Sequence, residues 1–204
     1  MLHPTTSLLC LPGKEPAHSM PIEIHQITAE DALWPALTDH LQRVMMARHA
    51  LTDGAARPDT YYLAACTDDT IVGHISIHQQ PLIAPASYLT QNEEKTLKRH
   101  SQPLSETFVQ TFAVEEDHRR RGYGRILQQA ALDLTVQLGA YQMRSWSSAD
   151  KQANYALKLS MGFAALPALY PMPGGQPISG VYFAKVVADA LSNDAAQSKN
   201  ATSR

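Results

Sequence analysis

The sequence predicts one α/β domain of the mixed α+β kind, in which a central mixed, mostly antiparallel sheet of about six to seven strands carries about four helices on its faces. The chain has 204 residues and a hydrophobic content of 44%, which suits one domain with a full core. Short runs with strand-like alternation are interleaved with stretches of helical periodicity. No internal repeat or low-complexity core segment interrupts this order.

The first predicted elements are a strand and a helix. Ile22–Ile27 alternates apolar and polar residues as a short strand does. Thr28 and Asp31 have the spacing of a capping box, and Pro35 suits the first turn of a helix. That helix is predicted to continue to Arg48, and the loop Gly54–Asp59 follows it. Its positions at helical spacing are Leu37, Leu41, Val44, Met45 and Arg48.

The middle of the chain predicts a hairpin and a long connection. The strands Thr60–Cys66 and Ile71–His78 are joined by Thr67–Asp69. The next segment, Gln79–Ser105, holds three prolines and a helical pattern around Thr90–Arg99. A connection of this length usually has a functional role.

The second half is predicted to alternate strands and helices. Gly122–Leu138 has the strongest helical pattern, with an apolar stripe and Gly139 at its end. The remaining elements are the strand Thr107–Val114, the strand Tyr141–Trp146, the helix Asp150–Met161, and the strands Phe163–Tyr170 and Val181–Val187, with the turn-rich loop Pro171–Gly180 between the last two.

The composition argues against several classes of protein. A net charge of -2 argues against a protein that coats nucleic acid or an anionic membrane. No apolar run approaches the roughly 20 residues that span a bilayer, and residues 1–19 lack the features of a signal peptide. Cys10 and Cys66 fall in a tail and a strand, so we expect no disulfide and a cytoplasmic protein. We expect residues 1–19 and 189–204 to be disordered, and Met20 is an alternative start.

The stretch Val109–Ile126, VQTFAVEEDHRRRGYGRI, predicts an anion site. The first N–H groups of a helix have no internal partner, and the helix dipole adds positive charge there. Gly122 and Gly124 carry no Cβ, so a phosphate can approach the amides closely. Permanent charge comes from Arg119, Arg120, Arg121 and Arg125. The predicted ligand is a pyrophosphate, although a solvated loop or an RNA contact would use the same arginines.

This pattern differs from two common nucleotide-binding motifs. It lacks the Gly-Lys-Ser/Thr ending of a triphosphate loop, and Leu127 stands where the dinucleotide fingerprint has its third glycine. Arg119, Gly122 and Gly124 instead fit R-x-x-G-x-G. Here the chain resembles the Gcn-related N-acetyltransferase (GNAT) superfamily, whose signature Q/R-x-x-G-x-G/A opens its long central helix. The resemblance covers roughly residues 20–187 and includes the Gly-Phe pair after the next helix.

The resemblance implies a domain over residues 20–188 that uses acetyl-CoA as a cosubstrate, needs no metal and does not bind nucleic acid or membrane. It implies acetyl transfer to a primary amine of a small molecule or peptide by direct attack on the thioester. The sheet is expected to splay at the cofactor site, between Thr107–Val114 and Tyr141–Trp146. The implied cofactor contacts are Phe112, Ala113, Val114, Arg119, Arg120, Arg121, Gly122, Tyr123, Gly124 and Arg125, with a backbone N–H at Val114 as the oxyanion donor.

The helix Asp150–Met161 departs from the family pattern N-x-x-A-x-x-L-Y-x-x-x-G-F. Lys158 stands at the position of the tyrosine that protonates the thiol, and Asn154 stands at the position of the alanine. We expect both to lie at the cofactor site, with the contact of Asn154 shifted in register. The general acid stays open between water, Tyr170 and Tyr182.

The general base is equally open between Glu106, His74 and His78. Glu106 begins a strand and is expected to lie in solvent. His74 and His78 are four residues apart on one strand and therefore share a face. Because the tyrosine is missing, a CoA-binding sensor or interaction protein with weak catalysis is the alternative function. Apolar residues in Gln79–Ser105 and Pro171–Gly180 suit either an acceptor pocket or a homodimer contact.

Overall fold

A computed structural model describes residues 22–68, 70–83, 96–170 and 175–187. The predicted extensions 1–19 and 189–204 lie outside these ranges, as does most of the connection between the third and fourth strands of the main sheet. In the described part of the chain, no helix is both long and apolar enough to cross a membrane.

Seven strands form the central sheet, in the order β1-β4-β5-β8-β9-β11-β10. Every pairing is antiparallel except β8 with β9, which confirms the predicted mixed, mostly antiparallel sheet. The strands are β1 (Glu23–Ile27), β4 (Thr60–Thr67), β5 (Thr70–Pro81), β8 (Ser105–Val114), β9 (Gln142–Ser148), β10 (Ala164–Tyr170) and β11 (Ile178–Val186). The helices are α1 (Trp34–Arg43), α2 (Ala47–Ala50), α3 (Tyr123–Gln137) and α4 (Gln152–Ser160). Two small hairpins pair β2 (Leu51–Thr52) with β3 (Ala55–Ala56) and β6 (Lys98–Arg99) with β7 (Gln102–Pro103).

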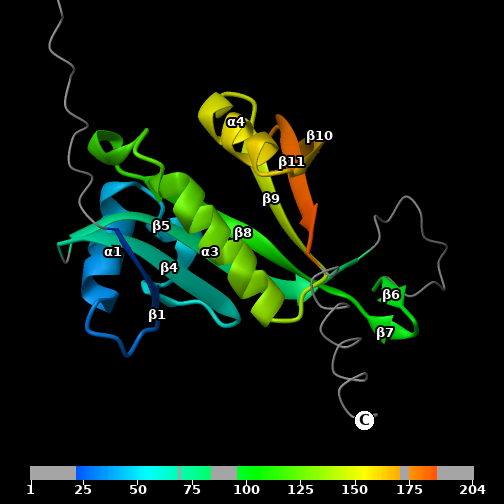
Figure 1. Ribbon diagram of the computed structural model, residues 1–204, viewed down its shortest axis with the longest axis horizontal. Helices are drawn as coiled ribbons and strands as arrows, with labels where there is room; N and C mark the ends of the chain where they lie inside the picture. The colour runs from blue at the N-terminus through cyan, green and yellow to red at the C-terminus, as the bar shows by residue number, and fades with distance from the viewer. Residues whose placement is uncertain (1–21, 69, 84–95, 171–174, 188–204) are drawn as a thin grey trace, which may run out of the picture.

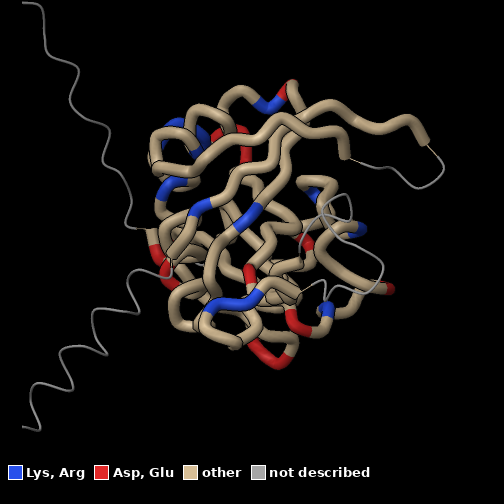
Figure 2. The backbone as a smooth tube through the Cα atoms, turned by 90° about the vertical axis from the view of Figure 1, so that its right-hand side faces the viewer, with Lys and Arg blue, Asp and Glu red and all other residues tan. Residues whose placement is uncertain are grey.

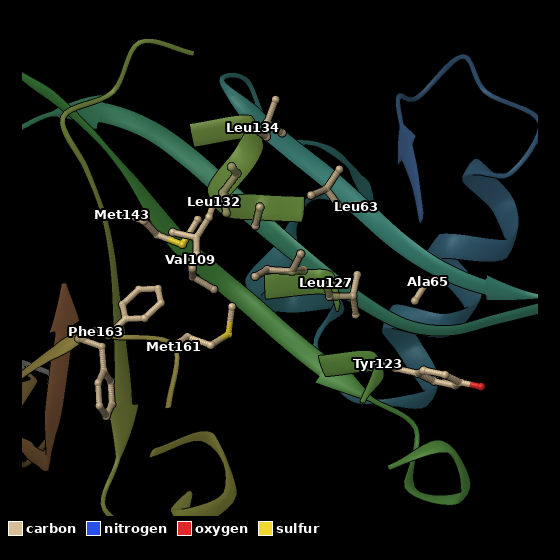
Figure 3. Packing of buried hydrophobic residues seen from close by; sticks show 14 of the residues in the cluster. Leu63, Ala65, Val109, Tyr123, Leu127, Leu132, Leu134, Met143, Met161 and Phe163 are labelled. Atoms are coloured by element: carbon tan, nitrogen blue, oxygen red, sulfur yellow. The ribbon is translucent and has the colours of Figure 1, made fainter. Parts of the chain in front are cut away.

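Helices cover both faces of the first half of the sheet. Along β4, Leu63 and Ala65 belong to the core under α3, whereas Tyr62 and Ala64 belong to the core under α1. Successive side chains of a strand point to opposite faces, so α1 and α3 lie on opposite sides of the sheet. Figure 3 shows the α3 side, where Leu127 and its neighbours pack on the strands.

The sheet opens between β8 and β9. These parallel strands pair only from Glu106 with Gln142 to Val109 with Ser145. At the same point β8 carries a bulge, because Ile77 pairs with Val109 and Ser76 pairs with Thr111, which leaves Gln110 as the extra residue. Figure 1 shows β9 turning away from β8 beyond this point, together with β11, β10 and α4. The predicted splay is therefore present.

Three details of the sequence prediction were wrong. The first helix ends at Arg43, because Met45 takes a left-handed conformation with φ 58° and separates α1 from α2. Asp31 bonds the amide and hydroxyl of Thr28, but this closes a turn ahead of α1 and does not cap the helix. The helical pattern predicted around Thr90–Arg99 does not reach Arg99, because Lys98–Arg99 is a strand. In each case tertiary pairing or local backbone geometry overrides a periodic pattern.

Candidate active site

The junction of β8 and α3 presents a row of free amides. Within the described residues, the backbone N–H groups of positions 120 to 124 have no hydrogen-bond acceptor, and α3 begins directly after Gly122. Gly122 has φ 87° and Arg120 has φ 60°, so the chain turns sharply enough for consecutive amides to face outward. This is the geometry that binds phosphate at a helix N-terminus.

Four arginines surround these amides. The guanidinium of Arg119 donates to Val114 O at 3.0 Å, Arg121 donates to Asp117 O at 3.0 Å, and Arg125 donates to Ser160 Oγ at 2.7 Å. Arg120 forms no hydrogen bond or ion pair with any described residue. All four side chains are exposed, so each can turn toward a bound anion.

The end of β8 directs peptide groups that pair with no strand into the opening of the sheet, and one of them, Val114 O, accepts from Arg119. Glu115 N, just past β8, donates to Val72 O of β5 at 2.9 Å. Peptide groups alternate in direction along a strand, so Phe112 and Val114 direct theirs away from β5. That side faces the gap left by β9, where an extended ligand can add as a strand.

Buried polar atoms beside the opening lack partners. Within the described residues these are Gln110 Oε1, Ser145 Oγ, Trp146 Nε1 and Asn154 Oδ1, and a fifth, His118 Nδ1, lies just before the amide row. An unsatisfied buried polar atom costs roughly 1–3 kcal/mol, so such a group indicates a missing partner. An elongated ligand that carries amides would supply one.

Gly124 lies between β8 and α4. A Cβ built on this residue would be 3.2 Å from the ring tip of Phe112 and 3.6 Å from Leu157. The absent side chain therefore allows β8 and α4 to pack closely against the start of α3. The free amides and the strand edge that pairs with no other strand together fit a pantetheine arm that ends in a pyrophosphate.

Comparison with known proteins gives the family. The model of the acetyltransferase (GNAT) family matches residues 23–163. This chain belongs to that family. Comparison with curated protein sequences found no match.

Solved structures of GNAT enzymes share the fold. Arabidopsis thaliana NAA60 in complex with acetyl-CoA has a TM-score of 0.60 and 15% identity, and the match covers 82% of this chain and 100% of that one. The ribosomal-protein-S18-alanine N-acetyltransferase from Escherichia coli has a TM-score of 0.55 and 16% identity, over 82% of this chain and 95% of that one. At such low identity the likeness shows the fold alone.

The last helix of this GNAT domain uses its polar residues internally. Asn154 Nδ2 donates to Ser147 Oγ at 3.1 Å, which leaves Oδ1 as its free atom. Lys158 is 1% exposed, and its Nζ donates to Gln128 Oε1 at 2.5 Å. Burial lowers the pKa of Lys158 to about 7. Its ammonium thus points into the contact between α3 and α4.

Glu106 is not in solvent, as the sequence suggested, but fully buried. Its carboxylate accepts N–H groups from Gln80 at 2.8 Å, from Gln142 at 2.9 Å and from Arg144 at 2.5 to 3.0 Å. The guanidinium of Arg144 also lies over the ring of Phe108. A carboxylate surrounded by donors anchors β8 to β9, and this geometry does not favour Glu106 as a proton acceptor.

His74 is buried in a hydrogen-bonded chain that the sequence did not reveal. It contacts His40 of α1 at 3.0 Å and Thr111 of β8 at 3.1 Å, and His40 contacts Glu115 at 3.0 Å. His78 is only half-buried and lies 3.5 Å from Thr60. The sequence did hold one signal that His40 is buried, because this residue lies on the apolar stripe of α1 with Leu37 and Leu41.

The two tyrosines considered as general acid lie on the far side of the opening. Tyr170 packs on Trp146 with 4.8 Å between ring centroids. Tyr182 lies under the guanidinium of Arg144, and burial raises its pKa. Separately, a shallow hollow of about 430 Å³ lies near the base of the long connection, lined by residues such as Gln80, Thr96 and Ser105.

Proposed function

We propose that this GNAT protein is an acetyl-CoA-dependent N-acetyltransferase that transfers an acetyl group to a primary amine of a small molecule or peptide by direct attack on the thioester. The observation that carries the proposal is the row of free amides at positions 120 to 124, which opens onto the unpaired edge of β8. A pyrophosphate on the amides and a pantetheine arm along the strand would satisfy both.

The residues of the chain have distinct tasks in this reaction. The amides and arginines of the loop hold the pyrophosphate, and Phe112 and Val114 hold the arm as an added strand. A backbone N–H of this edge, Val114 in the first instance, stabilises the oxyanion when the amine attacks the carbonyl. The leaving thiol has an ordinary pKa of about 8.5, so it departs with modest help from a proton donor.

Charge distribution supports a small anionic cosubstrate. Figure 2 shows Lys and Arg interspersed with Asp and Glu along the chain. A protein that tracks a nucleic-acid backbone would instead gather its basic residues into a stripe. The concentration of arginines is local, at positions 119 to 125.

Isothermal titration with acetyl-CoA and with CoA tests the cofactor site. We expect both to bind, and we expect Gly124→Trp to abolish binding, because Phe112 and Leu157 leave no room for the indole beside Gly124 and it must project into the opening of the sheet. Ile126→Trp is the matched control, since Ile126 is 40% exposed on the same helix. Melting curves check that both variants fold. Normal binding by Gly124→Trp, or no binding by the parent protein, would contradict the proposal.

A panel of amines, amino acids and peptides, assayed for release of free CoA, tests the reaction and identifies the acceptor class. The fold is shared with NAA60, solved with a bisubstrate analogue, and with a ribosomal-protein-S18-alanine N-acetyltransferase, which makes peptides with free N-termini a sensible first set. Release of CoA that depends on both the amine and the protein is the expected result.

A second function has one observation in its favour. Lys158 stands where the family tyrosine is expected, and its Nζ is bonded to Gln128 rather than free to protonate a thiol. A CoA-binding sensor or interaction protein of this fold would bind CoA without acetylating any amine. Lys158→Tyr discriminates the two, because a gain of turnover would show that the parent chain lacks its proton donor.

A further inference from the structure

A continuous hydrogen-bonded chain crosses the face of the sheet under α1. Glu115 Oε1 lies 3.0 Å from His40 Nδ1, and His40 Nε2 lies 3.0 Å from His74 Nδ1. His74 Nε2 lies 3.1 Å from Thr111 Oγ1, which lies 2.6 Å from Ser76 Oγ. The four inner side chains are 0 to 3% exposed, whereas the Glu115 side chain is 25% exposed.

With both imidazoles neutral, the carboxylate at one end sets the direction of each hydrogen bond in the chain. An ionised carboxylate only accepts, so His40 Nδ1 carries a hydrogen and donates to Glu115. His40 Nε2 is then the acceptor for His74 Nδ1–H, and His74 Nε2 is the acceptor for the hydroxyl of Thr111. The hydroxyl of Ser76 completes the chain as a donor to Thr111. This arrangement directs the basic nitrogen of His74 toward Thr111.

The surroundings of the chain keep both imidazoles neutral in the free protein, so the carboxylate of Glu115 must stabilise the imidazolium that forms during the reaction. Burial lowers the pKa of both histidines, that of His74 to about 3, with a further contribution from His40. Burial alone would raise the pKa of Glu115, but hydrogen bonds from Arg43 and His40 outweigh it and lower the pKa. The titratable and charged groups that face this chain are His40 and Arg43 of α1, Glu115 at the end of β8, and the thiol of Cys66 on the same face of β4.

The inner end of the chain lies on β8 at the point where this strand parts from β9. Thr111 directly follows Gln110, the bulge residue at which β8 and β9 part. The next residue, Phe112, belongs to the strand edge that would hold the arm, so the acyl carbonyl would lie beside Thr111. Glu106 is on the same strand, but its carboxylate is occupied by three donor side chains.

We propose that Glu115, His40 and His74, acting through the hydroxyl of Thr111, take the proton from the acceptor amine. This inference rests on the proposed acetyl transfer. As the amine nitrogen bonds to the acyl carbon, its proton passes to Thr111 Oγ1 while the Thr111 proton passes to His74 Nε2. The carbon–sulfur bond then breaks and the sulfur leaves as a thiolate. The positive charge is shared by the two imidazoles beside Glu115, whose exposed edge returns the proton to water.

Thr111 is the catalytic group of this relay, and the other three are positioning residues. Thr111→Val removes the hydroxyl at constant shape, and Thr107→Val is the matched control. Thr107 is equally buried on the same strand, but its hydroxyl bonds Thr135 on the α3 side. Acetyl-CoA affinity, measured by titration, is expected to be the same in both variants.

The readout is the pH profile of kcat with two nucleophiles. For a primary alkyl amine we expect Thr111→Val, His74→Gln and Glu115→Gln to lower kcat by about 100-fold, the scale of general base catalysis. For hydroxylamine, a weakly basic amine whose adduct loses its proton readily to water, we expect a change of less than about threefold. Equal losses with both nucleophiles, or no loss with the alkyl amine, would overturn the relay.

A second measurement separates this inference from the proposed function. Nitrogen-15 NMR of the histidine side chains in the protein alone should show His40 and His74 as neutral Nδ1–H tautomers at about pH 8, above the ordinary pKa of histidine. Any other tautomer overturns the relay even if the enzyme acetylates amines. Conversely, correct tautomers without acetyl-CoA binding overturn the proposed function, and acetyl-CoA binding without turnover of either nucleophile overturns both.

Discussion

Lys158 is an ammonium buried against Gln128 and the ring of Phe163, with no carboxylate partner among the described residues. Among the described residues only an amide oxygen and a ring face stabilise its charge, so burial dominates and lowers its pKa from 10.5 to about 7. Between pH 7 and pH 10.5, Lys158 is therefore protonated in the unfolded chain and largely deprotonated in the folded protein. Stability should rise as pH increases from 7 toward 10.5, and should be lowest below pH 7.

We expect Lys158→Met to flatten this dependence. The variant should be more stable than the parent near neutral pH, since methionine fills similar space without a charge to desolvate. Urea unfolding at a series of pH values across the window measures the slope. Lys185→Met is the control, because Lys185 is only half-buried and donates to Met161 O. An unchanged slope in the Lys158 variant would contradict the assignment.

The carboxylate of Glu106 makes a second prediction at the scale of single residues. Glu106→Ala would leave the guanidinium of Arg144 between two aromatic rings without its anion. Removal of one partner of a buried pair costs about 3–5 kcal/mol, so we expect a loss of stability on that order. The double variant Glu106→Leu with Arg144→Met should recover much of the loss. If Glu106 served catalysis instead, the single variant would lose turnover and keep its melting temperature.

At the scale of elements, local patterns in the sequence were sufficient for most of the fold. The stripe that begins at Leu127 predicted α3 because it repeats every turn, and alternation predicted β4 and β5. The end of α1 was missed because apolar spacing continues through Met45, whose left-handed backbone is set by packing rather than by its own propensity.

The two parts of the candidate site also differ in whether local sequence patterns predict them. The amide row follows from a contiguous stretch, so glycine and arginine spacing sufficed to locate it. The relay joins residues 34 to 75 positions apart in sequence, and only strand register and the placement of α1 bring them together. The burial of Glu106 likewise depends on the parallel pairing of β8 with β9. No single-sequence pattern carries that information.

Gly180 gives a prediction for the outer strands. A Cβ on this residue would lie 2.3 Å from Ser147 O and 2.6 Å from the ring of Trp146. A backbone carbonyl held in a sheet cannot retreat, so Gly180→Ala must displace β9 from β11 and should cost about 1–3 kcal/mol. Hydrogen exchange should become faster in β9 and β11. Ser179→Ala, at the exposed neighbouring position, should leave both stability and exchange unchanged.

For the whole molecule, the important feature is how little of the sheet joins its two parts. Within the sheet, the strands β1, β4, β5 and β8 are joined to β9, β11 and β10 through only four described residue pairs of β8 and β9, and contacts of α3 with α4 add to them. Figure 1 shows the divergence beyond them. A cosubstrate bound in the gap would touch the loop and β8 on one side and Asn154 of α4 on the other, so it would act as a bridge.

Acetyl-CoA should therefore stabilise both parts together. A ligand at about 100 times its Kd adds roughly 2.7 kcal/mol, which for a chain of this size raises the melting temperature by roughly 5–10 °C. Because the pyrophosphate is held by arginines and free amides, this shift should shrink as salt concentration rises. Hydrogen exchange should slow at the amides of 112 to 124 and also in α4, which has no pyrophosphate contact in this arrangement. Gly124→Trp should show neither effect, and protection confined to the loop would show that the ligand does not enter the gap between β8 and β9.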